Sequence, residues 1–182
     1  MTLIEVLITI VVFSIGILTI LSIITGSLTL GSRSRNRTTA TMLAKEWLEM
    51  MYNIRDTNLD KAQTWWCIAL NGSNNCVNNM TGDNTSYIIE STNNGIKILN
   101  WTVLADRRLY ISTNNGVTTY THSGTNTPSP FYRYITIKPT AGIPGTTTTI
   151  DANIKKIIST VEYSQLWWTG KVELESFIGL TR

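Results

Sequence analysis

The chain opens with an almost unbroken apolar run, from Thr2 to Ile24, and this run limits what the rest can fold into. About 20 apolar residues are enough for a helix to cross a bilayer. Glu5 is the only ionisable side chain before Arg33. A carboxylate at the centre of a membrane helix costs about 2.5–3.5 kcal/mol, and less near an end. We therefore interpret Glu5 as functional and expect its partner to be an α-amino group, on this chain or on a neighbouring one.

A local role for Glu5 is also open. Thr2-Leu-Ile-Glu5 fits the capping box, in which an N-cap Thr and a Glu three residues later satisfy free backbone N–H groups at a helix start. The carboxylate would also lie at the positive end of the helix dipole. A cap alone does not explain why this helix start opens a membrane-length run. We favour a role in assembly, with which capping is compatible.

Two segments of the chain resemble the type IV pilin family. Thr2-Leu-Ile-Glu-Val-Leu-Ile8 is similar to the start of mature pilins, which usually open with a methylated Phe before Thr-Leu-Ile-Glu; this chain has Met1 instead. The segment from Leu43 to Asn58, with Leu-Ala-x-Glu at its start and Arg-Asp-x-Asn at its end, resembles the helix end of pilin-like proteins. The resemblance implies that a prepilin peptidase removes a short leader, that the Met1 amine is methylated, and that Glu5 neutralises the Met1 amine of an adjacent subunit. Without the resemblance, a plain signal-anchored protein in which Met1 is the initiator remains open.

Gly16 and Gly26 lie within or just after the apolar run, and each costs about 1 kcal/mol relative to Ala in a helix. Neither is proline, so we expect the helix to run through both. The resemblance implies that the section from Phe13 to Gly26 loosens when the subunit leaves the membrane for a filament. We expect Gly16 to be the weak point.

From Ser32 onward the pattern becomes amphipathic, which predicts a continuous helix ending near Asp56-Thr57-Asn58. Lys45 and Glu49 are four residues apart and are expected to pair weakly. The predicted buried face follows i, i+3, i+4, i+7 spacing and consists of Ala40, Leu43, Ala44, Trp47, Met51 and Ile54.

The remainder of the chain predicts an antiparallel sheet, so the fold class is α+β, with the long N-terminal helix packed on the sheet. That layout is also what the resemblance implies.

Asn93-Asn-Gly95 and Asn114-Asn-Gly116 suit hairpin turns with positive φ. Residues 59–86 form a long connection and Ser123 to Pro130 a loop. The predicted strands, rich in β-branched and aromatic residues, are 87–90, 96–104, 108–112, 132–138, 154–163 and 171–178. We divide the chain into an apolar helix (1–27), its amphipathic continuation (28–57) and a β-rich domain (58–182).

Composition argues against direct nucleic-acid binding. The net charge is only +3, charged residues make up 15% of the chain, and the basic residues do not form a dense face. The 29 Thr and 16 Asn make the surface polar without charge, which suits an exported protein packed against copies of itself. Nucleic acid is expected as a partner only indirectly, through filament function.

Cys67 and Cys76 flank the turn signal Asn71-Gly72. In an extracytoplasmic setting the pair indicates a disulfide, which would contribute about 2–3 kcal/mol in the chain-entropy model. Two free thiols and a metal are the alternatives, but the single histidine, His122, is far away in sequence and a zinc site needs four ligands.

Six tryptophans are many for this length. Paired exposed tryptophans can form a surface for a glycan or another partner, whereas packing in the core or between subunits is more common. The candidates for such surface contacts are the two pairs Trp65, Trp66, Trp167 and Trp168.

No sequence motif indicates an enzyme, a cofactor or a metal site. A Gly-rich phosphate loop, a His-containing metal motif and a Gly-x-Ser-x-Gly elbow are all missing from the sequence. We expect His122, in Thr-Tyr-Thr-His-Ser-Gly, to lie in an exposed loop without a catalytic role.

The function expected from this resemblance is that of a structural pilin subunit. It is anchored in the inner membrane before assembly and forms an extracellular helical filament of many copies afterwards, with the globular domain outside the cytoplasm. Its expected partners are copies of itself and the pilus assembly machinery, and the expected roles are adhesion, motility or uptake. The alternatives are a pseudopilin of a type II secretion system and a membrane-anchored domain that binds a carbohydrate or another partner.

Overall fold

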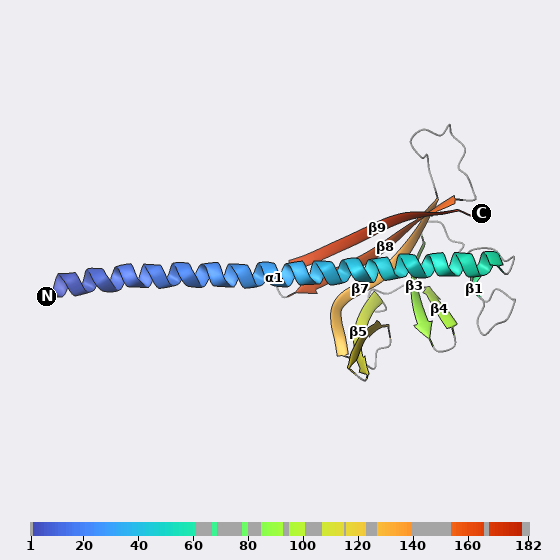
Figure 1. Cartoon of the computed structure of the whole chain (residues 1–182). Coiled ribbons are helices and arrows are strands. Elements are labelled where there is room, and N and C mark those ends of the chain that lie inside the picture. Colours follow the sequence, from blue (N-terminus) through green and yellow to red (C-terminus); the bar gives the residue numbers. More distant parts are fainter. Residues whose placement is uncertain are drawn as a thin grey trace, which may run out of the picture. The chain divides into compact units, whose positions relative to one another are not determined.

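A computed structural model describes residues 2–60, 67–68, 78–79, 85–92, 95–100, 107–114, 116–122, 127–139, 154–165 and 168–179. The chain divides into two compact units, Met1–Thr38 and Thr39–Arg182. The described part has an α+β architecture, as the sequence predicts: one long N-terminal helix and a curled antiparallel sheet, with the second half of the helix packed on the sheet (Figure 1).

Helix α1 spans Leu3–Asp60 and runs through Gly16 and Gly26 without a break, as predicted. It ends a few residues later than the Asp56–Asn58 region that the sequence indicated. Asn58 is itself buried, at 5% exposure, so the packed surface of the helix continues beyond the apolar pattern. The six residues predicted for the buried face are all buried, which confirms the helical period from Ala40 to Ile54.

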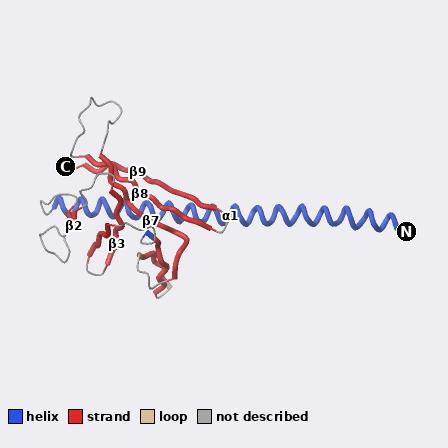
Figure 2. The backbone as a smooth tube through the Cα atoms, turned by 180° about the vertical axis from the view of Figure 1, so that it is seen from behind, coloured by secondary structure: helices blue, strands red, loops and turns tan. Residues whose placement is uncertain are grey.

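The main sheet is organised around β7, Thr127–Pro139, which Figure 2 shows beside β8. All pairings of β7 are antiparallel. One edge of β7 pairs with β8 from Phe131 to Pro139, and β8 in turn pairs with β9. The opposite edge is divided, since β5 pairs near the start of β7 and β3 near its end. The other strands of this sheet are β3 (Thr85–Thr92), β4 (Gly95–Asn100), β5 (Arg108–Asn114), β6 (Val117–Thr121), β8 (Ile154–Gln165) and β9 (Trp168–Gly179).

The two predicted hairpins are present as the antiparallel pairs β3–β4 and β5–β6. Gly116, in the turn between β5 and β6, has a φ of 78°, the conformation for which glycine is favoured. Strand β6 is not among the strands predicted from the sequence. Within the long connection, β1 (Cys67–Ile68) and β2 (Asn78–Asn79) form a separate antiparallel pair.

The predicted loop from Ser123 to Pro130 is wrong in its second half, because β7 begins at Thr127. Pro128 pairs with Tyr110 of β5, next to a register shift between Arg108 and Tyr110. Proline lacks an N–H and is tolerated at strand edges and irregularities. Pairing with β8 starts only at Phe131, so this proline-containing segment does not have to donate to a second neighbour.

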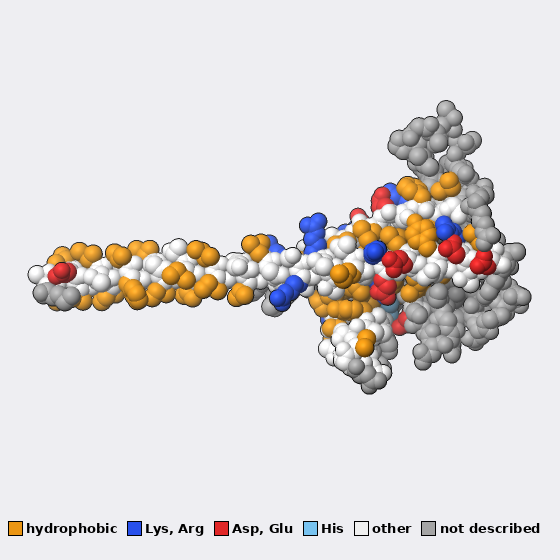
Figure 3. Space-filling model, in the orientation of Figure 1, with side chains coloured by type: hydrophobic (Ala, Val, Ile, Leu, Met, Phe, Trp, Pro, Cys, Tyr) orange, Lys and Arg blue, Asp and Glu red, His pale blue; other side chains and the backbone are white. Residues whose placement is uncertain are grey.

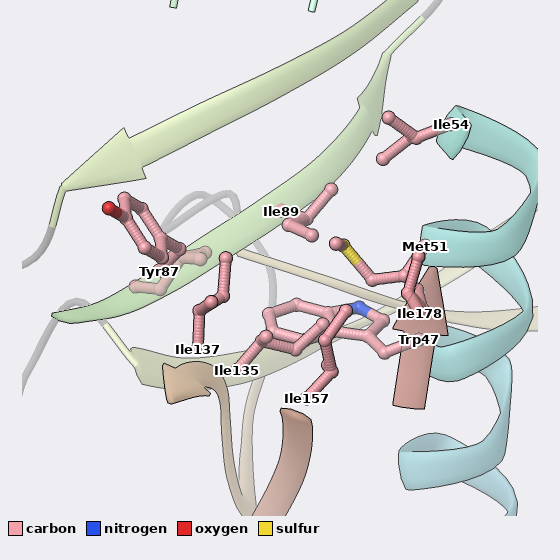
Figure 4. Packing of buried hydrophobic residues seen from close by; sticks show 10 residues of the cluster. Trp47, Met51, Ile54, Tyr87, Ile89, Ile135, Ile137, Ile157 and Ile178 are labelled. Atoms are coloured by element: carbon pink, nitrogen blue, oxygen red, sulfur yellow. The ribbon is translucent and has the colours of Figure 1, made fainter. Parts of the chain in front are cut away.

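The core lies between the second half of α1 and the sheet. In Figure 4, Trp47 and Met51 point from the helix toward the isoleucines of the strands. Trp47 is completely buried, and burial of a large side chain of this kind stabilises the fold by about 1.5–3 kcal/mol. A neighbouring cluster places Ala40 and Ala44, both small, against Phe131 and Tyr163. The main cluster consists of Trp47, Met51, Ile54, Tyr87, Ile88, Ile89, Ile135, Ile137, Ile157 and Ile178.

A charged side chain, Arg133 of β7, is buried in the same helix–sheet interface at 3% exposure. Its Nη1 donates to Glu46 Oε2 at 2.9 Å and to the carbonyl oxygen of Leu43 at 3.5 Å. Its guanidinium lies 4.3 Å from the centre of the Trp47 ring, a cation–π distance. Burial lowers the pKa of Arg133 to about 10 against the opposing effect of Glu46, so the side chain stays charged at neutral pH. Arg133 thus fixes one turn of α1 to the central strand.

Replacing Glu46 with Gln should destabilise the domain, because the buried charge of Arg133 would lose its ionised acceptor. Hydrogen bonds to charged groups contribute about 1.5–3 kcal/mol, and the half-exposed position of Glu46 reduces this to about 1–2 kcal/mol. Denaturant unfolding of the full chain in detergent measures the loss. Glu49→Gln is the matched control, because Glu49 pairs with Lys45 on the exposed side of the same helix and should change stability by less than about 0.5 kcal/mol. Equal losses in the two variants would contradict the role of Arg133.

In the β8–β9 hairpin, an aromatic ring lies across a glycine. Tyr163 pairs with Gly170, and a Cβ added to Gly170 would lie 2.3 Å from Tyr163 Cζ. The Tyr163 ring is nearly buried and meets Trp168 edge-to-face, with ring centres 5.4 Å apart. Since the ring is packed on several sides, glycine is the residue that this cross-strand contact requires.

Gly170→Ala should therefore destabilise the domain by about 1–3 kcal/mol, the typical cost of forcing extra atoms into a packed region. Gly179→Ala, on the same strand, is the control: its Cβ would meet Ile154 Cγ1 at 3.9 Å, an ordinary contact. That variant should be neutral or slightly more stable, because alanine reduces the entropy of the unfolded chain. The unfolding midpoints of the two variants test this. A Gly170→Ala protein as stable as the Gly179→Ala protein would show that the Tyr163 ring is free to move.

Candidate assembly site

The first half of α1 is apolar on every side. Large hydrophobic side chains are exposed along its whole length; Leu3 at one end is 81% exposed and Leu30 at the other end is 65% exposed. Figure 3 shows hydrophobic side chains, in orange, along this part of the helix. By length and composition this is a helix that can cross a membrane, so the segment is a candidate membrane anchor. Arg33, Arg35 and Arg37 follow directly after it.

Hydroxyl side chains within this segment hydrogen-bond to the helix itself. The hydroxyl of Ser14 donates to the carbonyl oxygen of Ile10 at 2.7 Å, and that of Thr19 to Ile15 at 2.9 Å. The same contact, four residues back along the helix, is made by Thr9, Thr25 and Thr29. Polar groups satisfied within a helix do not have to find partners in lipid or in an apolar bundle. These hydroxyls are therefore compatible with the apolar surroundings that the rest of the segment requires.

At the start of the helix, the Glu5 side chain accepts one of the two hydrogen bonds of the predicted capping box. The backbone N–H of Thr2 donates to Glu5 Oε2 at 3.4 Å, and the N–H of Glu5 donates to the Thr2 carbonyl oxygen at 3.0 Å. A distance of 3.4 Å is long for an N–H···O bond, so the carboxylate contact is weak. Exchanging the contact with the Thr2 N–H for one with an ammonium group would therefore cost little free energy. The Glu5 carboxylate is exposed, so an ammonium group can reach it.

The two glycines of the anchor have open space around them. A Cβ added to Gly16 or Gly26 would meet nothing within 4 Å. Nothing described within this single chain therefore requires glycine at either position.

Several predicted sites lie outside the described residues, namely Met1, Trp65, Trp66, Cys76 and Trp167. Of Cys67, only the backbone is described: it pairs with Asn79 between β1 and β2. The disulfide between Cys67 and Cys76 stays a prediction.

Among the four tryptophans considered for surface contacts, Trp168 is described. It is partly buried and packs against Tyr163 and the cluster around Phe131. This placement favours packing over a surface for a partner as the role of Trp168.

Two residues were not identified from the sequence as parts of the interface. His122 was expected in an exposed loop, but it is half-buried, with its ring centre 5.7 Å from that of Trp47 and its backbone N–H donating to Glu90 Oε1 at 3.2 Å. Arg133 was not singled out at all. Strand alternation contained the signal for it, because Arg133 occupies the same face as Ile135 and Ile137.

Within the described ranges, no group of three or more His, Cys, Asp or Glu side chains is placed to hold a metal ion. Comparisons with protein-family models, with curated proteins and with solved structures give no match to this chain.

A lysine at the centre of the apolar segment should impair membrane insertion. We expect Leu18→Lys to weaken insertion by about 2.5–3.5 kcal/mol, the cost of a charge at the centre of a membrane helix. Flotation of the chain with lipid vesicles, or its resistance to alkaline extraction from membranes, measures this. Met42→Lys is the control, because Met42 is 67% exposed on the second half of α1 and its replacement should leave insertion unchanged. Full membrane association of the Leu18→Lys chain would exclude the segment as an anchor.

Proposed function

We propose that this chain is a structural subunit of a type IV pilus or a related helical filament. The observation that carries the proposal is a membrane-length apolar helix with Glu5 in its first turn, continuous with an amphipathic helix that packs on an antiparallel sheet. In this proposal the helix anchors the subunit in the inner membrane and then forms the core of an extracellular filament.

The distribution of apolar side chains favours many neighbours over one. A helix that is apolar on one face needs one partner, whereas a helix that is apolar all round needs cover on every side. The segment from Leu3 to Leu30 is of the second kind. Lipid covers all sides of such a helix in a membrane, and a bundle of copies covers them in a filament. A simple pairwise contact would leave part of the segment in water.

Charge pairing gives the subunits a defined axial position. In a bundle of apolar helices, a carboxylate needs an oppositely charged partner, because an unpaired buried charge is strongly unfavourable. The partner we propose for Glu5 is the methylated N-terminal amine of Met1 on an adjacent copy. The weak contact from the Thr2 N–H supports this, since it leaves the carboxylate largely available.

The section from Phe13 to Gly26 is where we propose that the helix loosens in the filament. Glycine disfavours a helix by about 1 kcal/mol relative to alanine, and the open space at Gly16 and Gly26 means that no packing among the described residues opposes a local change.

A pseudopilin of a secretion system would share these features. The two differ in abundance, since a major pilin forms long surface filaments and a pseudopilin does not. Imaging filaments on the native cell and identifying their main protein distinguishes them. An unprocessed, unmethylated N-terminus would instead favour a membrane-anchored binding domain.

Glu5→Gln tests the pairing separately from the cap. Glutamine also serves at the third position of a capping box, so the helix start should be preserved while the charge is lost. We expect normal folding and membrane insertion, but a filament yield lower by about tenfold or more, as loss of a charged hydrogen bond of about 1.5–3 kcal/mol implies. Sheared filaments are quantified against total subunit, with Glu49→Gln as the control. A normal yield from Glu5→Gln would leave capping as the only role of Glu5.

A further inference from the structure

A cavity of about 490 Å³ lies on the β7–β8–β9 part of the sheet, and none of the residues that line it is used in the assembly proposal. This volume is in the range of about 300–1,000 Å³ that is typical of small-molecule sites. The lining residues on which the argument below depends are Tyr132, Glu162, Ser164, Thr169, Gly170 and Lys171.

Strand register brings the main chemical groups of this cavity into one row. Tyr132 of β7 pairs with Glu162 of β8, and Glu162 pairs with Lys171 of β9. Next to this row, Ser164 pairs with Thr169 near the end of the β8–β9 hairpin. An aromatic ring, a carboxylate, an ammonium and two hydroxyls therefore line one hollow.

Neighbouring side chains orient these groups. The Tyr134 hydroxyl donates to Glu162 Oε1 at 2.9 Å, and Lys171 Nζ lies 2.7 Å from Glu173 Oε1. Burial, together with the bond to Glu162, raises the pKa of Tyr134, so the hydroxyl keeps its proton and remains a donor at neutral pH. The guanidinium of Arg108 lies 5.8 Å from the centre of the Tyr132 ring, which holds that ring from one side.

The balance of charges indicates the class of ligand. One carboxylate and one ammonium line the cavity, so an anion would meet Glu162 and a cation would meet Lys171. A neutral molecule with several hydroxyls can instead donate to the carboxylate and accept from the ammonium. A pyranose ring has such hydroxyls at its edge and an apolar C–H face that packs on an aromatic ring.

We propose that this cavity binds a neutral saccharide. In this complex Tyr132 packs against the face of one sugar ring, and Glu162 and Lys171 form hydrogen bonds with the hydroxyls of that ring. The proposal does not depend on filament assembly. It gives the subunit a carbohydrate-binding surface whether the chain acts as a monomer in a membrane or as a copy in a filament.

The test uses the full chain in a zwitterionic detergent without a sugar headgroup, because an alkyl glycoside would compete for the cavity. The probe is an array of immobilised neutral mono- and oligosaccharides that end in hexoses or N-acetylhexosamines, followed by titration with the best binder. We expect wild-type chain to bind a subset of the array.

Two variants locate the binding. Glu162→Gln should weaken it by about tenfold, the factor expected for a lost charged hydrogen bond. Thr169→Trp places a large ring on an exposed residue at the cavity and should abolish binding, which keeps the test valid if Glu162→Gln lowers stability. Glu175→Gln is the control, since Glu175 is on β9, as Thr169 is, but pairs with Lys156 outside the cavity. Absence of any saccharide binding at millimolar concentration, or equal binding by the Thr169→Trp and wild-type chains, would overturn the proposal.

Discussion

The exclusion of apolar side chains from water acts on α1 in two different ways along its length. From Ala40 to Ile54 one face of the helix is covered by the sheet, and the chain itself supplies the partner. From Leu3 to Leu30 every face is apolar and exposed within the chain. A folded protein rarely leaves so large an apolar surface in water. This segment therefore needs a second environment, and we propose that lipid, and later a bundle of copies, provides it.

The contact between α1 and the sheet is specific as well as apolar. Trp47 fills the centre of the interface, and Arg133 lies against its ring with an ion pair to Glu46 on one side. An ionised side chain in an interface tolerates few alternative positions, because its charge must keep its partners. This contact therefore holds the second half of α1 in a defined position on the sheet.

The two proposed functional surfaces use different elements. The proposed assembly surface is the anchor with Glu5, which is encoded in the first residues of the chain. The proposed saccharide cavity lies on residues such as Tyr132 and Glu162, which alternate along their strands with residues that face the helix. The two surfaces share no side chain.

The sequence by itself determined whatever depends on local patterns: the apolar helix, the buried face from Ala40 to Ile54, and the turn at Gly116. It also indicated the contact between Thr2 and Glu5, three residues apart. Only the tertiary structure decided the divided edge of β7, the burial of Arg133 against Glu46, and the row of Tyr132, Glu162 and Lys171. The reason is that periodicity shows which face of an element is apolar, whereas strand order and register arise from pairing between segments far apart in the chain, and no local pattern specifies those partners.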